Sequence, residues 1–201
     1  MLDRSIPFYN MILRCGAPPA GPLLLPEGYR IRPYQPGDER AWARLEQETG
    51  DFPDQDQAEA YFVSRYCRDP AAVRRRCLFA VDRRERVVVG SCIAWQDPRG
   101  EGSVSSLHWL VVSSAHQRRG LGSALCRRAL QVYQELDAFP VYLHTQPWSY
   151  GALLLYVRLG FRLQRTDTFS GYENQYVQGM RTLRRILPAE AYRLLADSAE
   201  P

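Results

Sequence analysis

The feature that most restricts how this 201-residue chain can fold is a strand that runs into a glycine-containing turn, which then opens a helix. The strand is predicted over residues 103–113, and the turn reads Gln117-Arg-Arg-Gly-Leu-Gly122. The helix that follows, to about Leu136, offers unpaired N–H groups and the positive end of its dipole at its start. Because glycine has no Cβ, a ligand can approach this backbone closely. We predict that the turn binds a diphosphate.

Two common diphosphate motifs are excluded by particular residues. A Walker loop needs a lysine, and all 26 basic positions of the chain are arginine. A dinucleotide fingerprint needs a third glycine where Leu125 stands. The remaining pattern, (Q/R)xxGx(G/A), is matched at every fixed position by Gln117, Gly120 and Gly122. It resembles the turn with which the GCN5-related N-acetyltransferases, the GNAT family, bind the pyrophosphate of acetyl-CoA.

A second segment strengthens this resemblance. Residues 149–161 read Ser-Tyr-Gly-Ala-Leu-Leu-Leu-Tyr-Val-Arg-Leu-Gly-Phe, which is similar to the family pattern NxxAxxLYxxxGF. Serine stands at Ser149, where the family often has asparagine, and this weakens the expected amide contact to the pantetheine arm. The resemblance covers about residues 29–168. The segments Thr145–Tyr150 and Thr168–Asn174 are also similar to a bacterial branch of the family.

The order of predicted strands and helices indicates an α/β fold. The resemblance implies a mixed, mostly antiparallel sheet flanked by helices, with a parallel, splayed pair of strands that holds acyl-CoA. We expect a leader and linker over residues 1–28, an acetyltransferase domain over 29–184 and a helical extension over 185–201. The predicted elements are strand 29–34, a helix capped by Asp38, helix 54–68, a hairpin of 78–82 and 86–96, strand 140–145, helix 149–158, strand 161–168, a loop and last strand within 170–180, and helix 184–196, which Pro188 breaks near its start.

The resemblance also implies which residues bind acetyl-CoA. The pyrophosphate would lie on the turn, the pantetheine would pair with the preceding strand, and its thiol end would lie against the helix of the second motif. The cofactor-binding residues are therefore expected to be Leu110, Val111, Val112, Gln117, Arg118, Arg119, Gly120, Leu121, Gly122, Ser123, Ser149 and Tyr156. The acceptor amine would attack the thioester directly in a ternary complex.

The chemistry requires groups that move protons. An alkyl amine has a pKa of about 10, so it must lose a proton before it can attack. His108 lies on the strand before the turn and is the candidate base, with Glu101 and Glu173 as further candidates. Tyr156 stands where the family often has the acid that protonates the CoA thiolate. The alternatives are a structural histidine at 108 and a tyrosine that only packs on the cofactor.

Other residues favour structural roles. Cys126 is expected in the core, His116 in an exposed turn and His144 in the sheet. The five cysteines form no CxxC pair, which argues against a zinc site or disulfides and favours a reduced, cytoplasmic protein. No window reaches the roughly 20 apolar residues of a membrane span, and the N-terminus lacks the pattern of a signal peptide.

The net charge and the family resemblance indicate which binding partners to expect. Arg74–Arg76 are interpreted as a solvated hairpin edge, and the net charge of +4 does not favour nucleic-acid binding. We expect a small-molecule amine or a peptide as substrate, and the choice among a protein N-terminus, a polyamine, an antibiotic and a metabolite stays open. A homodimer formed through the C-terminal segment is a hypothesis. The alternative to an enzyme is a non-catalytic acyl-CoA-binding module on the same fold.

Overall fold

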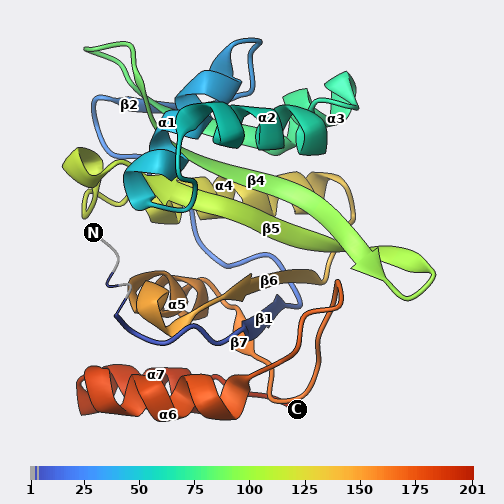
Figure 1. Ribbon diagram of the computed structural model, residues 1–201, viewed down its shortest axis with the longest axis vertical. Helices are drawn as coiled ribbons and strands as arrows, with labels where there is room; N and C mark the ends of the chain where they lie inside the picture. Colours follow the sequence, from blue (N-terminus) through green and yellow to red (C-terminus); the bar gives the residue numbers. More distant parts are fainter. Residues whose placement is uncertain (1–2, 4) are drawn as a thin grey trace. The chain divides into compact units, whose positions relative to one another are not determined.

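The computed structural model describes residues 3 and 5–201, and within them the chain forms an α/β fold with a seven-stranded sheet (Figure 1). The strands hydrogen-bond in the order β2-β3-β4-β5-β6-β1-β7. Antiparallel pairs join β1 to β6 and β7, and β3 to β2 and β4. Strands β5 and β6 are parallel, with Ser105 opposite Val141. The predicted mixed, mostly antiparallel sheet with one parallel pair is confirmed.

The elements are β1 (Met11–Cys15), β2 (Tyr29–Pro33), α1 (Asp38–Thr49), α2 (Gln55–Tyr66), α3 (Pro70–Arg76), β3 (Cys77–Asp82), β4 (Val88–Arg99), β5 (Gly102–Val112), the 3₁₀ turn η1 (Ser114–His116), α4 (Leu121–Glu135), β6 (Val141–Thr145), the 3₁₀ turn η2 (Pro147–Ser149), α5 (Tyr150–Arg158), β7 (Arg162–Leu163), α6 (Tyr176–Ile186) and α7 (Ala189–Asp197).

The chain divides into two compact units. The first comprises Ala20–Trp95 and Leu107–Glu135. The second comprises the described residues up to Pro19, Gln96–Ser106 and Leu136–Pro201. The long strands β4 and β5 each contribute residues to both units.

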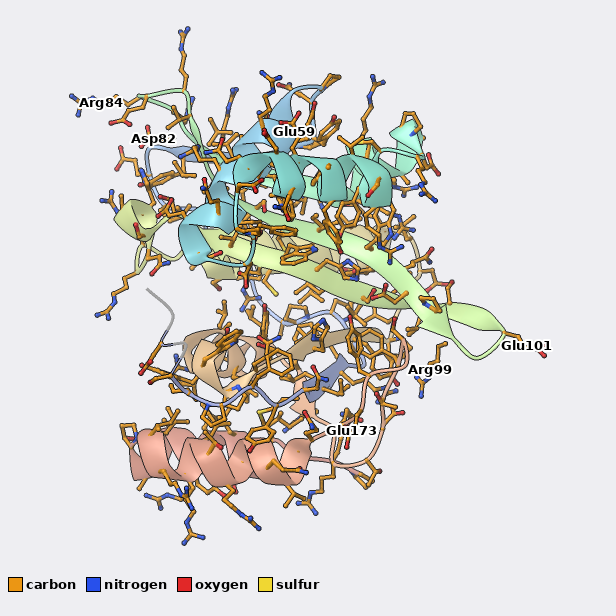
Figure 2. The ribbon with its side chains drawn as sticks, in the orientation of Figure 1. Glu59, Asp82, Arg84, Arg99, Glu101 and Glu173 are labelled. Carbon is orange, nitrogen blue, oxygen red and sulfur yellow. The ribbon has the colours of Figure 1, made fainter. Side chains whose placement is uncertain are left out.

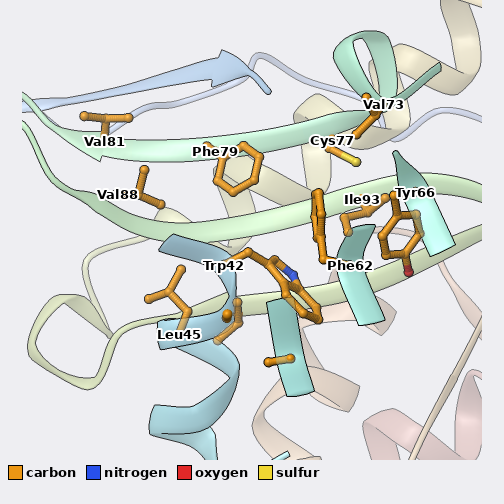
Figure 3. Close-up of a cluster of buried hydrophobic side chains, with 13 residues drawn as sticks. Trp42, Leu45, Phe62, Tyr66, Val73, Cys77, Phe79, Val81, Val88 and Ile93 are labelled. Atoms are coloured by element: carbon orange, nitrogen blue, oxygen red, sulfur yellow. The ribbon is translucent and has the colours of Figure 1, made fainter. Parts of the chain in front are cut away.

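The core of the first unit lies between the sheet and the helices α1 and α2. Trp42, Phe62 and Phe79 are fully buried and lie close together in Figure 3. Trp42 and Leu45 are three residues apart on α1, so they share the face that packs on the sheet. Full burial of such a side chain stabilises the fold by about 1.5–3 kcal/mol. The cluster therefore fixes α1 and α2 against the sheet.

Gly90 lets strand β4 approach β5 and α4 closely. A Cβ at this position would lie 2.8 Å from the carbonyl oxygen of Val111 and 3.1 Å from Cδ1 of Leu125. Real Cβ atoms do not approach a backbone oxygen so closely, so only glycine fits here. This close packing holds the end of β5 in place.

In the second unit, β1 is buried between β6 and β7. Met11, Ile12 and Leu13 have no exposed surface. Helix α6 approaches this strand at Gly179, where a Cβ would lie 2.7 Å from the sulfur of Met11. Figure 1 shows α6 and α7 side by side.

Strand β1 falls within the segment predicted as a leader. Its residues pair with β6 on one edge, as Ile12 does with His144, and with β7 on the other, as Leu13 does with Leu163. Both partners lie more than a hundred residues away in the sequence, so no local pattern identifies the strand.

The interpretation of Arg74–Arg76 as a hairpin edge is wrong, because these residues end helix α3. Asp69 caps this helix by accepting from the N–H groups of Ala71 and Ala72, and Pro70 occupies the first turn. An acidic N-cap followed by proline is a local start signal that the sequence contains.

The predicted cap of α1 is also wrong. Gly37, with φ 100°, precedes the helix and takes the left-handed conformation that glycine adopts readily. Asp38 is instead buried, and its carboxylate accepts from the backbone N–H of Gln35 and pairs with the guanidinium of Arg32.

The C-terminal part differs most from prediction. The expected last strand within 170–180 is replaced by the start of α6, in which Gly179, Met180 and Leu183 are buried at helical spacing. The predicted strand 161–168 is reduced to β7. The helix predicted over 184–196 is broken near its start, as expected, but its first residues belong to α6. Pro188 lies between α6 and α7, because proline cannot continue the hydrogen bonding of α6.

Candidate functional site

The glycine turn has the backbone that its sequence requires. Strand β5 ends at Val112 and α4 begins at Leu121, as predicted. Gly120 has φ 87° and Arg118 has φ 60°, so two residues of the turn lie in the left-handed region. This conformation is unusual for a residue other than glycine, and it concentrates at ligand-binding turns. The turn delivers the chain directly into the N-terminus of α4.

Side chains brace the turn from within the first unit. The amide nitrogen of Gln117 donates to the carbonyl of Val112, 3.0 Å away. The guanidinium of Arg119 donates to the hydroxyl of Tyr29 at 3.0 Å and to the carbonyl of Ala115 at 3.2 Å. Two residues predicted to contact the ligand thus also hold the turn in shape.

Tyr29 and His116 are members of this site that sequence reasoning missed. The hydroxyl of Tyr29 lies 2.9 Å from Nδ1 of His116, although 87 residues separate them. His116 is therefore half-buried and hydrogen-bonded, where the sequence predicted an exposed residue. Tyr29 is buried and connects β2 to both His116 and Arg119.

Glu48 at the end of α1 fixes the first residues of the turn. Its carboxylate accepts from the backbone N–H of Ser114 at 2.7 Å and from the hydroxyls of Ser113 and Ser114. Partial burial by itself raises the pKa of this carboxyl, but the hydrogen bonds from the serines and the charge of Arg44 outweigh it, so the pKa lies below its usual value. The ionised form of Glu48 is the one that holds the turn.

The end of β5, which is predicted to align the pantetheine, has side chains that are buried or half-buried. Val111 is buried, whereas Leu110 and Val112 are half-buried. Trp109, directly before them, has φ 49°, a conformation rare for a bulky residue. Strand β5 is therefore irregular at its end, next to the predicted cofactor segment.

The candidate base His108 is held by a tyrosine. Its Nδ1 lies 2.8 Å from the hydroxyl of Tyr66, which comes from the last turn of α2. Burial raises the pKa of Tyr66 well above its usual value, and a hydrogen bond with Tyr61 adds to this effect. Tyr66 is therefore a neutral hydroxyl that orients the imidazole. The other candidates, Glu101 and Glu173, are exposed, and Glu101 lies at the tip of the β4–β5 hairpin (Figure 2).

In the second unit, the helix of the second motif presents Tyr156. This side chain is buried, and its ring lies edge-on to that of Phe161, with centroids 5.6 Å apart. Ser149 precedes α5 and is half-buried, and its hydroxyl does not cap the helix. The two predicted residues of the thiol end thus lie at opposite ends of one short helix.

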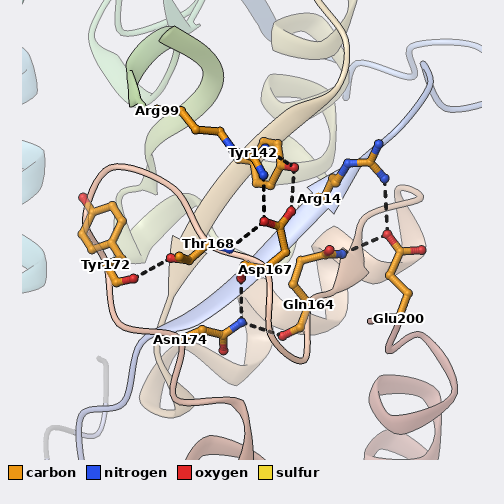
Figure 4. A network of polar contacts seen from close by, with 9 residues as sticks. All are labelled: Arg14, Arg99, Tyr142, Gln164, Asp167, Thr168, Tyr172, Asn174 and Glu200. Carbon is orange, nitrogen blue, oxygen red and sulfur yellow. Dashed lines mark hydrogen bonds and ion pairs between the residues drawn. The ribbon is translucent and has the colours of Figure 1, made fainter. Parts of the chain in front are cut away.

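A polar network in the second unit holds the loop between β7 and α6 (Figure 4). Asp167 accepts from Arg99 and from the hydroxyl of Tyr142, both at 2.7 Å. The amide of Asn174 donates to the carbonyls of Gln164 and Asp167. The sequence did not predict this network, because Arg99 and Tyr142 come from β4 and β6, far from the loop along the chain.

His144 lies on β6, as expected, with its ring 4.0 Å from that of Tyr172. Cys126 is fully buried in α4, as predicted for a core residue. Among residues 3 and 5–201, no cluster of three or more histidine, cysteine, aspartate or glutamate side chains could hold a metal ion. In the same part of the chain, the helices fall short of the length and hydropathy that a bilayer span requires.

The mixed sheet and the glycine turn at the start of α4 define the acetyltransferase class of α/β folds. The model of the acetyltransferase (GNAT) family matches residues 40–161, more than half of the chain. The chain therefore belongs to the GNAT acetyltransferase family.

Relatives agree with this assignment. Mycothiol acetyltransferase from Pseudarthrobacter chlorophenolicus is 31% identical over 157 residues, which cover 73% of this chain and 46% of that protein. N-acetyltransferase family 8 member 3 from Rattus norvegicus is 35% identical over 95 residues, or 46% of this chain and 40% of that one. The chain thus spans less than half the length of these two relatives.

Solved structures show the same fold. A GCN5-related N-acetyltransferase from Sphaerobacter thermophilus matches with a TM-score of 0.63 at 25% identity, covering 78% of this chain and 48% of that one. An acetyltransferase from Trypanosoma brucei matches with a TM-score of 0.53 at 21% identity, covering 70% and 96%.

Proposed function

We propose that this chain transfers the acetyl group of acetyl-CoA to a primary amine of a small molecule or a protein N-terminus. The observation that carries the proposal is the braced glycine turn at the start of α4. Arg118 and Arg119 are exposed and carry positive charge, and Arg118 and Gly120 have a left-handed backbone. The turn leads into the N-terminus of α4, whose first N–H groups have no partner within the helix. These are the properties that a pyrophosphate requires, and the hydrogen bonds of Gln117 and Arg119 preorganise them.

The remaining cofactor contacts follow from the family. Leu121, Gly122 and Ser123 would offer the first N–H groups of α4 to the pyrophosphate. The backbone of Leu110–Val112 would pair with the pantetheine, and one N–H of β5 would donate to the thioester oxygen as charge develops there. Ser149 and Tyr156 would line the thiol end.

The reaction requires two proton transfers. The neutral amine nitrogen attacks the thioester carbon, the carbon–sulfur bond breaks, and CoA leaves as a thiolate. One proton of the attacking nitrogen goes to a base, and the thiolate takes a proton from an acid. We assign these roles to His108 and Tyr156, so that the products are the amide and the thiol of CoA.

The contact with Tyr66 suits His108 to this role. We assign the hydroxyl of Tyr66 as donor to Tyr61 and as acceptor from Nδ1–H of His108. This arrangement keeps the proton on Nδ1, so that Nε2 is the basic nitrogen. The tyrosine would also stabilise the imidazolium that forms when the amine loses its proton.

Calorimetric titration of acetyl-CoA tests the proposal. Gly120→Glu adds a negative side chain at a position of the turn with φ 87°, a conformation that side-chain-bearing residues rarely adopt. Gly16→Glu is the matched control, because Gly16 is exposed and has no atom within 4 Å of an added Cβ. We expect micromolar binding to the wild type and to Gly16→Glu, and none to a folded Gly120→Glu.

The outcomes separate the alternatives. A folded wild type that does not bind acetyl-CoA contradicts the proposal. Binding without turnover of any amine in a broad screen supports the non-catalytic acyl-CoA-binding module instead. Circular dichroism and thermal melting of each variant show whether it is folded.

A further inference from the structure

Four aromatic rings of the first unit form a compact cluster beside the end of β5. Trp42 comes from α1, Phe52 from the connection between α1 and α2, Tyr61 from α2 and Trp109 from β5. Every pair of these rings is in contact, with centroids between 5.4 Å (Phe52 and Tyr61) and 6.1 Å (Trp42 and Tyr61) apart. Trp42 is fully buried, whereas the other three rings keep part of their surface exposed. The cluster is a partly exposed aromatic wall.

Trp109 places this wall next to the predicted cofactor segment. Its backbone has φ 49°, which a tryptophan adopts only when its surroundings hold it there. The residue directly precedes Leu110–Val112, the segment assigned to the pantetheine. The aromatic cluster therefore lies beside the part of β5 at which an acceptor would meet the thioester.

A buried carboxyl group lies beside Trp42 on α1. Glu46 is one helical turn after Trp42 on α1 and is only 2% exposed. Among the residues that the structure describes, its Oε1 has no hydrogen-bond partner, and neither has Nε1 of Trp42. A buried polar atom without a partner destabilises a fold, and native proteins seldom contain one without a function.

The chemistry of this arrangement selects a cation. An ionised carboxylate only accepts hydrogen bonds, and an ammonium group only donates them. An ammonium at this position would therefore stabilise the ionised form of Glu46, which burial alone disfavours. The faces of tryptophan, tyrosine and phenylalanine attract a cation as well. Asp51 adds a second negative charge close to Glu46. The rings at the exposed rim are apolar, so they favour a ligand whose ammonium is carried on an apolar or aromatic group.

We propose that Glu46 and the aromatic cluster bind the ammonium group of an arylalkyl primary amine, which is the acceptor in the proposed acetyl transfer. The inference rests on the proposed function for the identity of the reaction, but the binding of the amine can be measured without acetyl-CoA. Phe52 must move to admit the ligand, and its place in the connection between α1 and α2 lets it move without breaking a helix.

Three probes with the same ring and chain test this proposal: phenethylamine, 2-phenylethanol and 3-phenylpropanoate carry a positive, a neutral and a negative head. In calorimetric titrations of the wild type, we expect phenethylamine to bind most tightly, 2-phenylethanol more weakly and 3-phenylpropanoate most weakly. Glu46→Gln keeps the shape and removes the charge, and we expect it to lower the affinity for the amine by about ten-fold or more without changing that for the alcohol.

Glu59→Gln is the matched control. Glu59 lies on α2, where Figure 2 shows it on the outer surface, and it pairs with the exposed Arg40 at 3.5 Å. This variant removes one carboxylate of the same unit and should leave all three affinities unchanged. Phe52→Leu provides a second test: loss of the ring should weaken the amine and the alcohol alike, by about two- to ten-fold.

Equal affinity of the wild type for the amine and the alcohol, or of Glu46→Gln and the wild type for the amine, would overturn the inference. A greater affinity for spermidine than for phenethylamine would overturn the substrate class. Titration of acetyl-CoA into the same samples keeps the two proposals apart. Normal acetyl-CoA binding without selectivity for the amine contradicts this inference and leaves the proposed function standing. Selectivity for the amine without acetyl-CoA binding contradicts the proposed function and supports the amine site.

Discussion

The hydroxyl of Tyr66 lies 2.8 Å from Nδ1 of His108 and joins the end of α2 to strand β5. Tyr66 is fully buried, and a buried hydroxyl requires a hydrogen-bond partner, which the imidazole of His108 provides. The contact gives His108, identified in the sequence only by its place before the glycine turn, a fixed orientation. It also makes Tyr66 a positioning residue for the proposed base.

If His108 is the base, His108→Gln should lower kcat/KM for an amine by about 10²- to 10⁴-fold. Tyr66→Phe keeps the ring in the core and removes only the hydroxyl, so we expect a smaller loss. Because Tyr66 acts through His108, the double variant should be no slower than His108→Gln alone. Steady-state kinetics of the three variants measure this, and additive losses would show that Tyr66 has only a structural role.

Tyr156→Phe should reduce turnover while acetyl-CoA binds with unchanged affinity. The phenol is assigned as the acid for the CoA thiolate, and loss of such a group slows a reaction by about 10²-fold or more. Tyr150→Phe is the control, because Tyr150 is an exposed tyrosine at the start of the same helix. If both variants turn over as the wild type does, Tyr156 is only a packing residue.

Glu46→Gln should change the pH dependence of stability. Burial, with a further contribution from Asp51, raises the pKa of the Glu46 carboxyl well above its usual value. The folded protein therefore holds this proton more tightly than the unfolded chain does. The stabilisation is complete at low pH and is lost as the pH rises from the unfolded pKa, about 4.3, through the raised folded pKa.

The wild type and Glu46→Gln should accordingly have similar free energies of unfolding near pH 4. The variant should gain on the wild type as the pH rises, because the amide does not ionise. Urea unfolding at a series of pH values from 4 to 8 measures the difference. A gain that shrinks with rising pH would mean that Glu46 is ionised and stabilised in the folded protein.

Gly90→Ala should destabilise the first unit and weaken acetyl-CoA binding. The added methyl would lie 2.8 Å from the carbonyl oxygen of Val111, a backbone atom that can shift only with β5. Overpacking of this kind reduces the free energy of unfolding by about 1–3 kcal/mol. Chemical denaturation measures it, with Gly16→Ala as the control. A variant as stable as the wild type would show that β4 and β5 separate easily here.

Local signals in the sequence were sufficient to predict the glycine turn and the helix of the second motif, residues 149–161. The left-handed backbone at Gly120 and the start of α4 depend on adjacent residues, so Gln117–Gly122 could be recognised without any tertiary contact. The helix that carries Tyr156, and its end before the left-handed Gly160, follow from the same kind of short-range pattern. The hairpin of β3 and β4 also joins neighbouring segments, and the sequence predicted it.

Tertiary structure decided what depends on residues far apart. Strand β1 exists because β6 and β7 supply its hydrogen bonds. The helical start of α6 is stabilised where Gly179 meets Met11, and the sequence pattern there suggested a strand. Burial makes Glu46 chemically unusual, although on a helix such as α1 a glutamate looks like any surface residue. Hydrogen-bonded pairs such as Tyr29 with His116 form only after the chain has closed loops of many residues, and composition and periodicity carry no information about which loops close.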